Sequence, residues 1–299
     1  MTQLSRSASD ELQSSLAEIC RVAGLDDRNA KLIKYTNNVV WHLATAPVIV
    51  RIGVGEIGRT RAPRVVRLAN WLAENDAPVP RLHPGIEQPV VTSDTAATIW
   101  EWLPGSENHW DITDLAVPLR TLHALEPPED ASLPRWDPFA AAQRRLAAAD
   151  PALPAPDLAW IDEQWQQVED DYFGLRPQRC GIVHGDAHTG NLLCDHHGRA
   201  VLCDLDSAGY GPLAWDLATS AVDAVRFGAS GDHERLASAY GYDVTTDPAW
   251  SVLRRIRELG LITSVIPDLA RRPAVAAEHA RRLAALRQGD STTRWRPYR

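Results

Sequence analysis

A short polar loop between apolar segments constrains this chain more than any other feature. Residues 184–191 read His-Gly-Asp-Ala-His-Thr-Gly-Asn, and two further acids, Asp204 and Asp206, follow an apolar run at 200–203. The apolar residues at 180–183 and 192–194 are typical of short buried strands. Such strands would hold the polar groups on a rigid frame of loop and hairpin, where functional residues are commonly displayed.

The spacing of Asp186, Asn191 and Asp204 meets the needs of metal-assisted phosphoryl transfer. In that chemistry one carboxylate orients the attacking hydroxyl, while an amide and a second carboxylate hold magnesium on the phosphates of a nucleotide. The structural alternative is a polar turn between two core strands, in which these side chains only cap turns and strand ends. The combination of both motifs in a strand context favours the catalytic interpretation.

At these residues the chain resembles the aminoglycoside phosphotransferase family, the kinase-like group that also includes choline and fructosamine kinases. Further landmarks of the family follow in order along most of the chain: an apolar strand at 48–52, a Pro-rich link at 77–81, a hinge-like segment at 99–105, a helix at 122–125 and Trp-Asp-Leu-Ala at 215–218. The resemblance implies an α+β protein with a two-lobed, protein kinase-like fold.

The expected lobes are a small mixed β-sheet lobe and a mostly helical lobe. Residues 1–102 would form the nucleotide-binding N-terminal lobe, and residues 103–299 the C-terminal lobe that carries catalysis and acceptor binding. Pro63 fits the first turn of a helix that runs to about residue 75. Helical periodicity predicts further helices near residues 138–149, 157–174, 214–228, 232–241, 248–260 and 273–288.

The resemblance also implies roles for individual residues. Asp186 would be the catalytic base, Asn191 and Asp204 would bind Mg²⁺, and Asp206 would be an additional metal ligand. His184 and Asp216 would support the catalytic loop. Arg51 would bind the phosphates of the nucleotide, which is ATP or GTP. Backbone groups of the hinge residues Glu101 and Leu103 would bond the edge of its base. The apolar side chains around the base would be those of Val40, Ile49, Leu193 and Cys203.

Three departures from the family pattern concern the phosphates. The two lysines of the chain, Lys31 and Lys34, precede the strand at 48–52, so Arg51 is the cation on that strand. The next helix has no Glu at the usual place, and Glu56 or Glu74 would have to pair with Arg51. The nucleotide loop at 35–38 contains no glycine. A nucleotide-binding pseudokinase therefore remains an alternative.

A metal-dependent hydrolase is the second alternative. His184, Asp186 and His188 alternate in the sequence. On an extended strand they would share one face and form a metal-binding cluster, to which Asp204 and Asp206 could add. Zinc or manganese dependence would distinguish this enzyme from a kinase.

Charge is distributed unevenly along a chain whose net charge is −8. Residues 180–250 hold ten acids and three Arg, which weakly favours a cationic hydroxyl acceptor such as an aminoglycoside, an amino sugar or choline. Residues 254–299 hold eleven Arg and four acids, and their paired Arg predict a solvated helix face. No nucleic-acid motif accompanies them, so we expect no nucleic-acid partner.

Hydropathy gives no sign of a membrane segment. No apolar stretch approaches 18 residues, so we expect no membrane partner. Residues 1–10 are polar and lack the apolar core of a secretory signal. We therefore expect a cytoplasmic enzyme.

Overall fold

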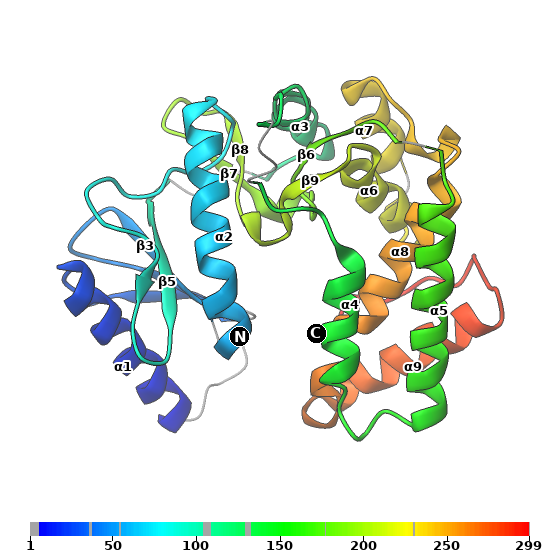
Figure 1. Cartoon of the computed structure of the whole chain (residues 1–299), viewed down its shortest axis with the longest axis horizontal. Helices are drawn as coiled ribbons and strands as arrows, with labels where there is room; N and C mark the ends of the chain where they lie inside the picture. The colour runs from blue at the N-terminus through cyan, green and yellow to red at the C-terminus, as the bar shows by residue number, and fades with distance from the viewer. Residues whose placement is uncertain are drawn as a thin grey trace. The chain divides into compact units, whose positions relative to one another are not determined.

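The computed structural model describes residues 6–35, 38–53, 55–103, 109–128, 133–176, 178–229 and 231–298. The chain divides into two compact units (Figure 1). The first comprises Met1–Trp110, Pro127–Pro134 and Gly190–Ala208, and the second comprises Asp111–Glu126, Arg135–Thr189 and Gly209–Arg299. The expected lobe boundary at 102/103 stays a prediction, because compactness alone does not define an independently folding domain.

The first unit contains a five-stranded sheet in the order β1-β2-β3-β5-β4. All of its strand pairs are antiparallel, so the expectation of a mixed sheet is wrong in this detail. Short connections join several of these strands directly, and such connections allow only antiparallel pairing. The strands are β1 (Lys31–Tyr35), β2 (Asn38–His42), β3 (Val48–Gly53), β4 (Val90–Val91) and β5 (Ala96–Glu101).

Alternation along the strands separates two faces of this sheet. Val50 and Ile99 face a core that also contains Leu16 and Ile19 of α1 (Arg6–Ala23). Arg51 and Thr98, paired in register, lie on the opposite face beside α2 (Gly55–Glu74). The sheet therefore carries a charged side chain on the face that its apolar core does not occupy.

Helix α2 begins earlier than the sequence predicts. Pro63 lies well inside the helix and not in its first turn. The proline ring removes one backbone donor, and this makes proline unfavourable inside a helix. The helix start predicted from Pro63 is therefore wrong, while the predicted end near residue 75 is confirmed.

A β-hairpin completes the first unit. Strands β7 (Leu192–Cys194) and β8 (Ala200–Leu202) pair in antiparallel register, and a 3₁₀ turn, η3 (Leu205–Ser207), follows. The Leu202 amide donates to the Pro78 carbonyl at 2.8 Å, which ties the hairpin to the segment after α2. This contact positions the acids that follow β8.

The second unit is mostly helical, as predicted. Strands β6 (Cys180–Val183) and β9 (Gly209–Pro212) pair within it, α5 packs on α8, and α6 packs on both α7 and α8. Its helices are α3 (Ala116–His123), α4 (Pro138–Ala147), α5 (Ala155–Phe173), α6 (Ala214–Arg226), α7 (Asp232–Tyr240), α8 (Trp250–Thr263) and α9 (Pro273–Arg287). Within the described ranges, no helix is long and apolar enough to cross a membrane.

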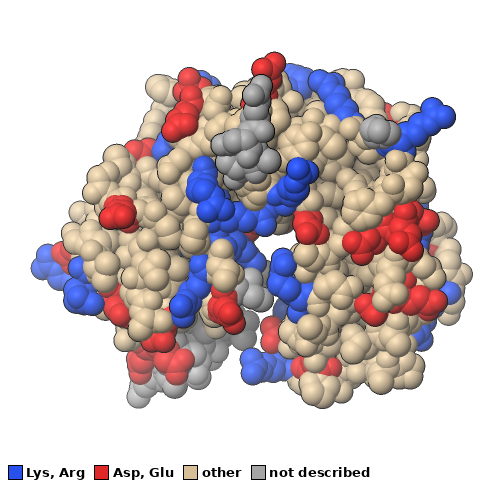
Figure 2. Space-filling model, in the orientation of Figure 1, with Lys and Arg blue, Asp and Glu red and all other residues tan. Residues whose placement is uncertain are grey.

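The Arg-rich C-terminal segment is only partly a solvated face. Arg282 is fully buried, pairs with Glu278 at 3.0 Å and lies over the rings of Trp295 and Tyr298. The expectation of solvated Arg pairs is therefore wrong for Arg282, because tertiary packing supplies an acid and aromatic faces that a helical repeat does not reveal. On the visible surface, basic and acidic side chains are interspersed (Figure 2).

Candidate active site

The loop at residues 184–191, which the sequence predicts to be the catalytic loop, leaves strand β6 after Val183 with a sharp change of direction. Gly185 has a φ of +84°, a conformation that side chains with a Cβ rarely adopt. His184 is fully buried, whereas 41% of the Asp186 side chain is exposed. The loop thus anchors itself in the core at His184 and presents the next acid at the surface.

Asp216 fixes the backbone of this loop. Its buried carboxylate accepts hydrogen bonds from the His184 amide at 2.6 Å and the Gly185 amide at 2.7 Å, and lies 3.0 Å from His123 Nε2. The neighbouring Trp215 indole donates to the Gly185 carbonyl at 2.8 Å. The first turn of α6 therefore holds both the amides and a carbonyl of the catalytic loop.

Asp186 is an ionised carboxylate with a cation beside it. Arg257 Nη1 of α8 donates to Asp186 Oδ1 at 3.0 Å, and His188 Nε2 lies 3.7 Å from Oδ2. Burial raises the pKa of Asp186, but Arg257 and His188 together hold that pKa below its ordinary value. At neutral pH the Asp186 oxygens are therefore hydrogen-bond acceptors.

A second acid, Asp223 of α6, shares these surroundings. Burial raises its pKa to about 6; the Arg257 charge opposes that rise and the Asp186 charge adds to it. Asp223 follows Asp216 by seven residues, which places both on one side of a helix. That periodicity is the sequence signal for Asp223, whereas no local pattern connects Arg257 with Asp186.

The hairpin of the first unit brings the predicted metal ligands close together. The Cys203 amide donates to the Asn191 carbonyl at 2.8 Å, so Asn191 lies opposite the residue that precedes Asp204. Asp204 has a φ of +68°, an uncommon and strained conformation for a residue other than glycine. Mg²⁺ prefers oxygen ligands, and the Asn191 side-chain amide and the Asp204 carboxylate both supply them. These two residues therefore fit a magnesium site.

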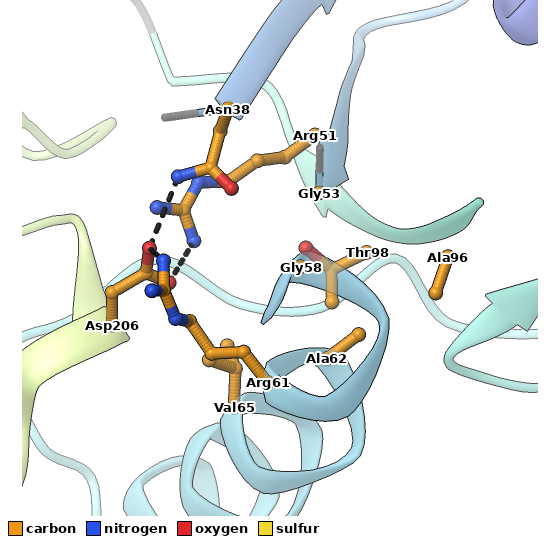
Figure 3. A pocket seen from close by; sticks show the side chains of 10 residues that line it. All are labelled: Asn38, Arg51, Gly53, Gly58, Arg61, Ala62, Val65, Ala96, Thr98 and Asp206. Carbon is orange, nitrogen blue, oxygen red and sulfur yellow. Dashed lines mark hydrogen bonds and ion pairs between the residues drawn. The ribbon is translucent and has the colours of Figure 1, made fainter. Parts of the chain in front are cut away.

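The Asp206 carboxylate faces donor side chains from the sheet and from α2 (Figure 3). Its Oδ1 accepts a hydrogen bond from Arg51 Nη1 at 2.6 Å, and its Oδ2 accepts from Arg61 Nη1 at 2.6 Å and from Asn38 Nδ2 at 3.0 Å. Burial raises the pKa of Asp206, while Arg51 and Arg61 hold that pKa below its usual value. Three donors thus already satisfy the carboxylate that was expected to be an additional metal ligand.

Arg51 finds its acidic partners on the hairpin side of the unit. Its Nη2 donates to Asp204 Oδ1 at 2.6 Å, in addition to the bond with Asp206. These acids replace the missing helix Glu, and α2 contributes a second cation, Arg61, where an acid was sought. No local sequence pattern marks Arg61, because its partner lies 145 residues away in the chain.

Two glycines allow α2 to approach this cluster. A Cβ on Gly53 would lie 2.6 Å from Gly58 Cα, a distance that real Cβ atoms essentially never show. Gly58 would meet the Gly53 backbone in the same way. The end of β3 and the first turn of α2 therefore touch backbone to backbone, which brings Arg61 within reach of Asp206.

The side chains expected around the nucleotide base all belong to the first unit. They are partly exposed, unlike their neighbours in the core, and comprise Val40, Ile49, Glu101, Leu103, Leu193 and Cys203. Burial raises the pKa of Cys203 to about 11, so its thiol is neutral. The loop residues 36–37 and the hinge residues 104–105 lie outside the described residues.

The hydrolase cluster expected from alternation does not form. His184 is buried in the core while Asp186 and His188 face outward, because β6 ends at Val183 and the turn at Gly185 breaks the alternation. Among the described residues, no group of three or more His, Cys, Asp or Glu could hold a metal ion. The metal-dependent hydrolase is therefore not retained.

Comparison with known families identifies the class. Residues 32–256 match the model of the phosphotransferase enzyme family. This match spans most of the chain, and it includes the loop at residues 184–191 and the β7–β8 hairpin. The chain belongs to the phosphotransferase enzyme family.

Solved structures of low sequence identity share the fold of this chain. A choline/ethanolamine kinase family protein from Mesorhizobium loti is 20% identical over 94% of both chains, with a TM-score of 0.63. A microcompartment-associated aminopropanol kinase is 18% identical over 95% of this chain and 99% of the other, with a TM-score of 0.66. A spectinomycin phosphotransferase in complex with ADP and spectinomycin is 15% identical over 92% and 93%, with a TM-score of 0.54.

The expected kinase-like α+β fold is thereby confirmed. No curated protein matches the sequence.

Proposed function

We propose that this phosphotransferase moves the γ-phosphoryl group of ATP or GTP to a hydroxyl group of a small molecule, with Mg²⁺ as cofactor. The observation that carries the proposal is the catalytic loop, in which Asp216 fixes two amides and Asp186 is presented as an exposed carboxylate. The spectinomycin phosphotransferase of similar fold, which binds ADP and spectinomycin, supports the choice of nucleotide and acceptor type.

Asp186 has the central part in this mechanism. Its carboxylate accepts a hydrogen bond from the acceptor hydroxyl and takes the proton as the oxygen attacks the γ-phosphorus. A bond forms between that oxygen and phosphorus, the bond from phosphorus to the β,γ-bridging oxygen breaks, and the nucleoside diphosphate leaves. Because the transition state is loose, orientation by Asp186 contributes more than its basicity.

Asn191 and Asp204 would hold magnesium, which offsets the charge of the phosphates. Arg51 and Arg61 would contact phosphate oxygens, since a guanidinium can donate two parallel hydrogen bonds to one phosphate. The described partners of both arginines are carboxylates, Asp204 and Asp206, so each is already held in an anion-binding orientation. His184 and Asp216 would keep Asp186 in place. Asp206 would orient the two arginines and not bind metal.

The apolar residues expected around the base keep their proposed role. Val40 and Ile49 lie partly exposed on neighbouring strands, and Leu193 and Cys203 lie on the hairpin of the same unit. The Glu101 and Leu103 backbone would bond the base edge. A cationic acceptor, which the acidic composition of residues 180–250 weakly favours, is one class that the experiments below distinguish.

The test compares Asp186→Asn with wild type and with Glu234→Gln, a matched loss of an exposed carboxylate on α7. Nucleoside diphosphate release is measured across a panel of hydroxylated metabolites and aminoglycosides. We expect Asp186→Asn to lose about 100-fold or more in kcat, with unchanged nucleotide affinity by calorimetry. Near-wild-type turnover of the mutant on a confirmed acceptor would refute the role of Asp186.

Magnesium is tested by nucleotide calorimetry with and without the metal. Asp204→Ala should abolish the gain in affinity that magnesium gives wild type, whereas Asp206→Ala should retain part of it. An equal magnesium effect in Asp204→Ala and wild type would transfer the ligand role elsewhere. Nucleotide binding without turnover on any acceptor would identify a pseudokinase.

A further inference from the structure

The side chain beside the proposed catalytic base is a cation from another element. Arg257 of α8 donates from Nη1 to Asp186 Oδ1 at 3.0 Å, and 17% of the Arg257 side chain is exposed. We propose that Arg257 selects the acceptor by binding an acidic group, a carboxylate or a phosphate, that the acceptor carries close to its reacting hydroxyl. This inference rests on the proposed function, because it takes Asp186 as the group that meets the hydroxyl.

The acceptor can contact Asp186 and Arg257 at the same time, because the two side chains touch each other. A hydroxyl that transfers its proton to Asp186 must come within hydrogen-bond reach of the carboxylate. Substituents one or two carbons from that hydroxyl then lie within a few ångströms of the guanidinium, which touches the same carboxylate. An acidic substituent is attracted there, while an ammonium group is repelled by the like charge.

The guanidinium has donor capacity left for such a group. An arginine carries five N–H donors in a planar fork that matches carboxylate and phosphate oxygens. Within the described part of the chain, Arg257 donates a hydrogen bond to Asp186 alone, and its Nε has no partner. If Arg257 served only as a counterion in the fold, we would expect protein acceptors to use more of these donors.

Protonation of Asp223 can offset the negative charge that an acidic acceptor brings. Burial raises the pKa of Asp223 to about 6, the Arg257 charge lowers that pKa, and the Asp186 charge raises it. When an acidic group binds Arg257, Asp223 can become neutral by taking up a proton. The three side chains come from the catalytic loop, α6 and α8, so the charges around the base are mixed and not simply acidic.

The experiment uses acceptors that share a skeleton and differ in charge. The three-carbon series is glycerate, glycerol and 3-amino-1,2-propanediol, and the six-carbon series is gluconate, glucose and glucosamine. Glycerol 3-phosphate and glucose 6-phosphate separate phosphate from carboxylate recognition. For each compound, kcat/KM is measured by nucleoside diphosphate release, and binding is measured by calorimetry.

The variants are Arg257→Gln and Arg257→Lys, with Arg255→Gln as the matched control. Arg255 lies on the same helix, but it pairs with Asp171 of α5. We expect wild type to prefer the acidic member of a series at least about tenfold in kcat/KM. Arg257→Gln should lower kcat/KM for the acidic member at least about tenfold more than for the neutral member of the same series, and Arg257→Lys should restore part of that difference. The control should behave like wild type.

The outcomes separate this inference from the proposed function. Preference for the amino compounds, equal losses on all members in Arg257→Gln, or no binding of any acidic member would overturn the role of Arg257. Turnover of an amino compound that depends on Asp186 would leave the proposed function standing in that case. Binding of an acidic member that requires Arg257, without phosphoryl transfer, would retain the inference and refute the proposed function.

Discussion

Asp223→Asn should stabilise the folded protein at neutral pH. Burial raises the pKa of Asp223 from 3.8 to about 6. A tenfold change in a protonation equilibrium corresponds to about 1.4 kcal/mol, so ionising Asp223 costs the folded state about 3 kcal/mol more than it costs the unfolded state. Asparagine resembles the protonated acid in shape and has no charge, so the variant avoids this cost.

The sign of the pH dependence follows from the direction of the shift. The folded state binds the Asp223 proton more tightly than the unfolded state does, so the associated stability is fully present below about pH 4. It is lost as the pH rises through 6, where wild-type Asp223 ionises in the folded protein. The advantage of the variant should therefore be near zero at pH 4 and about 3 kcal/mol above pH 7.

The assay is urea unfolding at several pH values between 4 and 8, followed by circular dichroism and tryptophan fluorescence. Thermal unfolding should show a rise of about 2–4 °C for each kcal/mol in a unit of this size. Asp170→Asn, an exposed acid on α5, is the matched control and should stay within about 0.5 kcal/mol of wild type. A stability difference that is independent of pH, or a destabilised Asp223→Asn at pH 7.5, would refute the assignment of a partly buried, destabilising carboxylate.

Three further predictions test other parts of the structure. Asp216→Ala leaves two buried loop amides without their acceptor and should lower the free energy of unfolding by about 3 kcal/mol or more, measured by urea unfolding; a loss below about 1 kcal/mol would contradict the structural role. Arg51→Ala should raise the nucleotide KM at least about tenfold and Arg51→Lys should recover only part of that loss, whereas unchanged KM values in both would exclude phosphate anchoring. Gly58→Ala places a Cβ against the Gly53 backbone and should weaken both stability and nucleotide affinity; unchanged calorimetry and unfolding would show that α2 does not need this close approach.

The sequence was most informative where the chemistry is local. Apolar periodicity and the spacing of a few polar residues predict the catalytic loop, the strands β6 and β7 on either side of it, and most helices. Asp111, a residue type typical of helix N-termini, caps the 3₁₀ turn Ile112–Leu115 that leads into α3. These features depend on neighbours within a few residues, which is the range over which sequence patterns carry structural information.

Errors arose where a local rule met tertiary packing. Pro63 usually marks a helix start, yet α2 extends through it, with Gly58 pressed against the end of β3. Alternation predicted one face for His184 and Asp186, yet the turn at Gly185 sends one inward and the other outward. At Pro63, packing outweighed an unfavourable helix preference of about 3 kcal/mol. At Gly185, the turn ended the strand on which the alternation depended.

By itself, the sequence determined the kinase-like class and the positions of the loop acids, because these rest on short motifs in a recognisable order. Only the tertiary structure decided which cations those acids meet. Arg61 reaches Asp206 across 145 residues, and Arg257 reaches Asp186 across 71. The physical reason is that an arginine on a helix presents the same local pattern whether it faces solvent or an acid, and only the packing of distant elements determines which it faces.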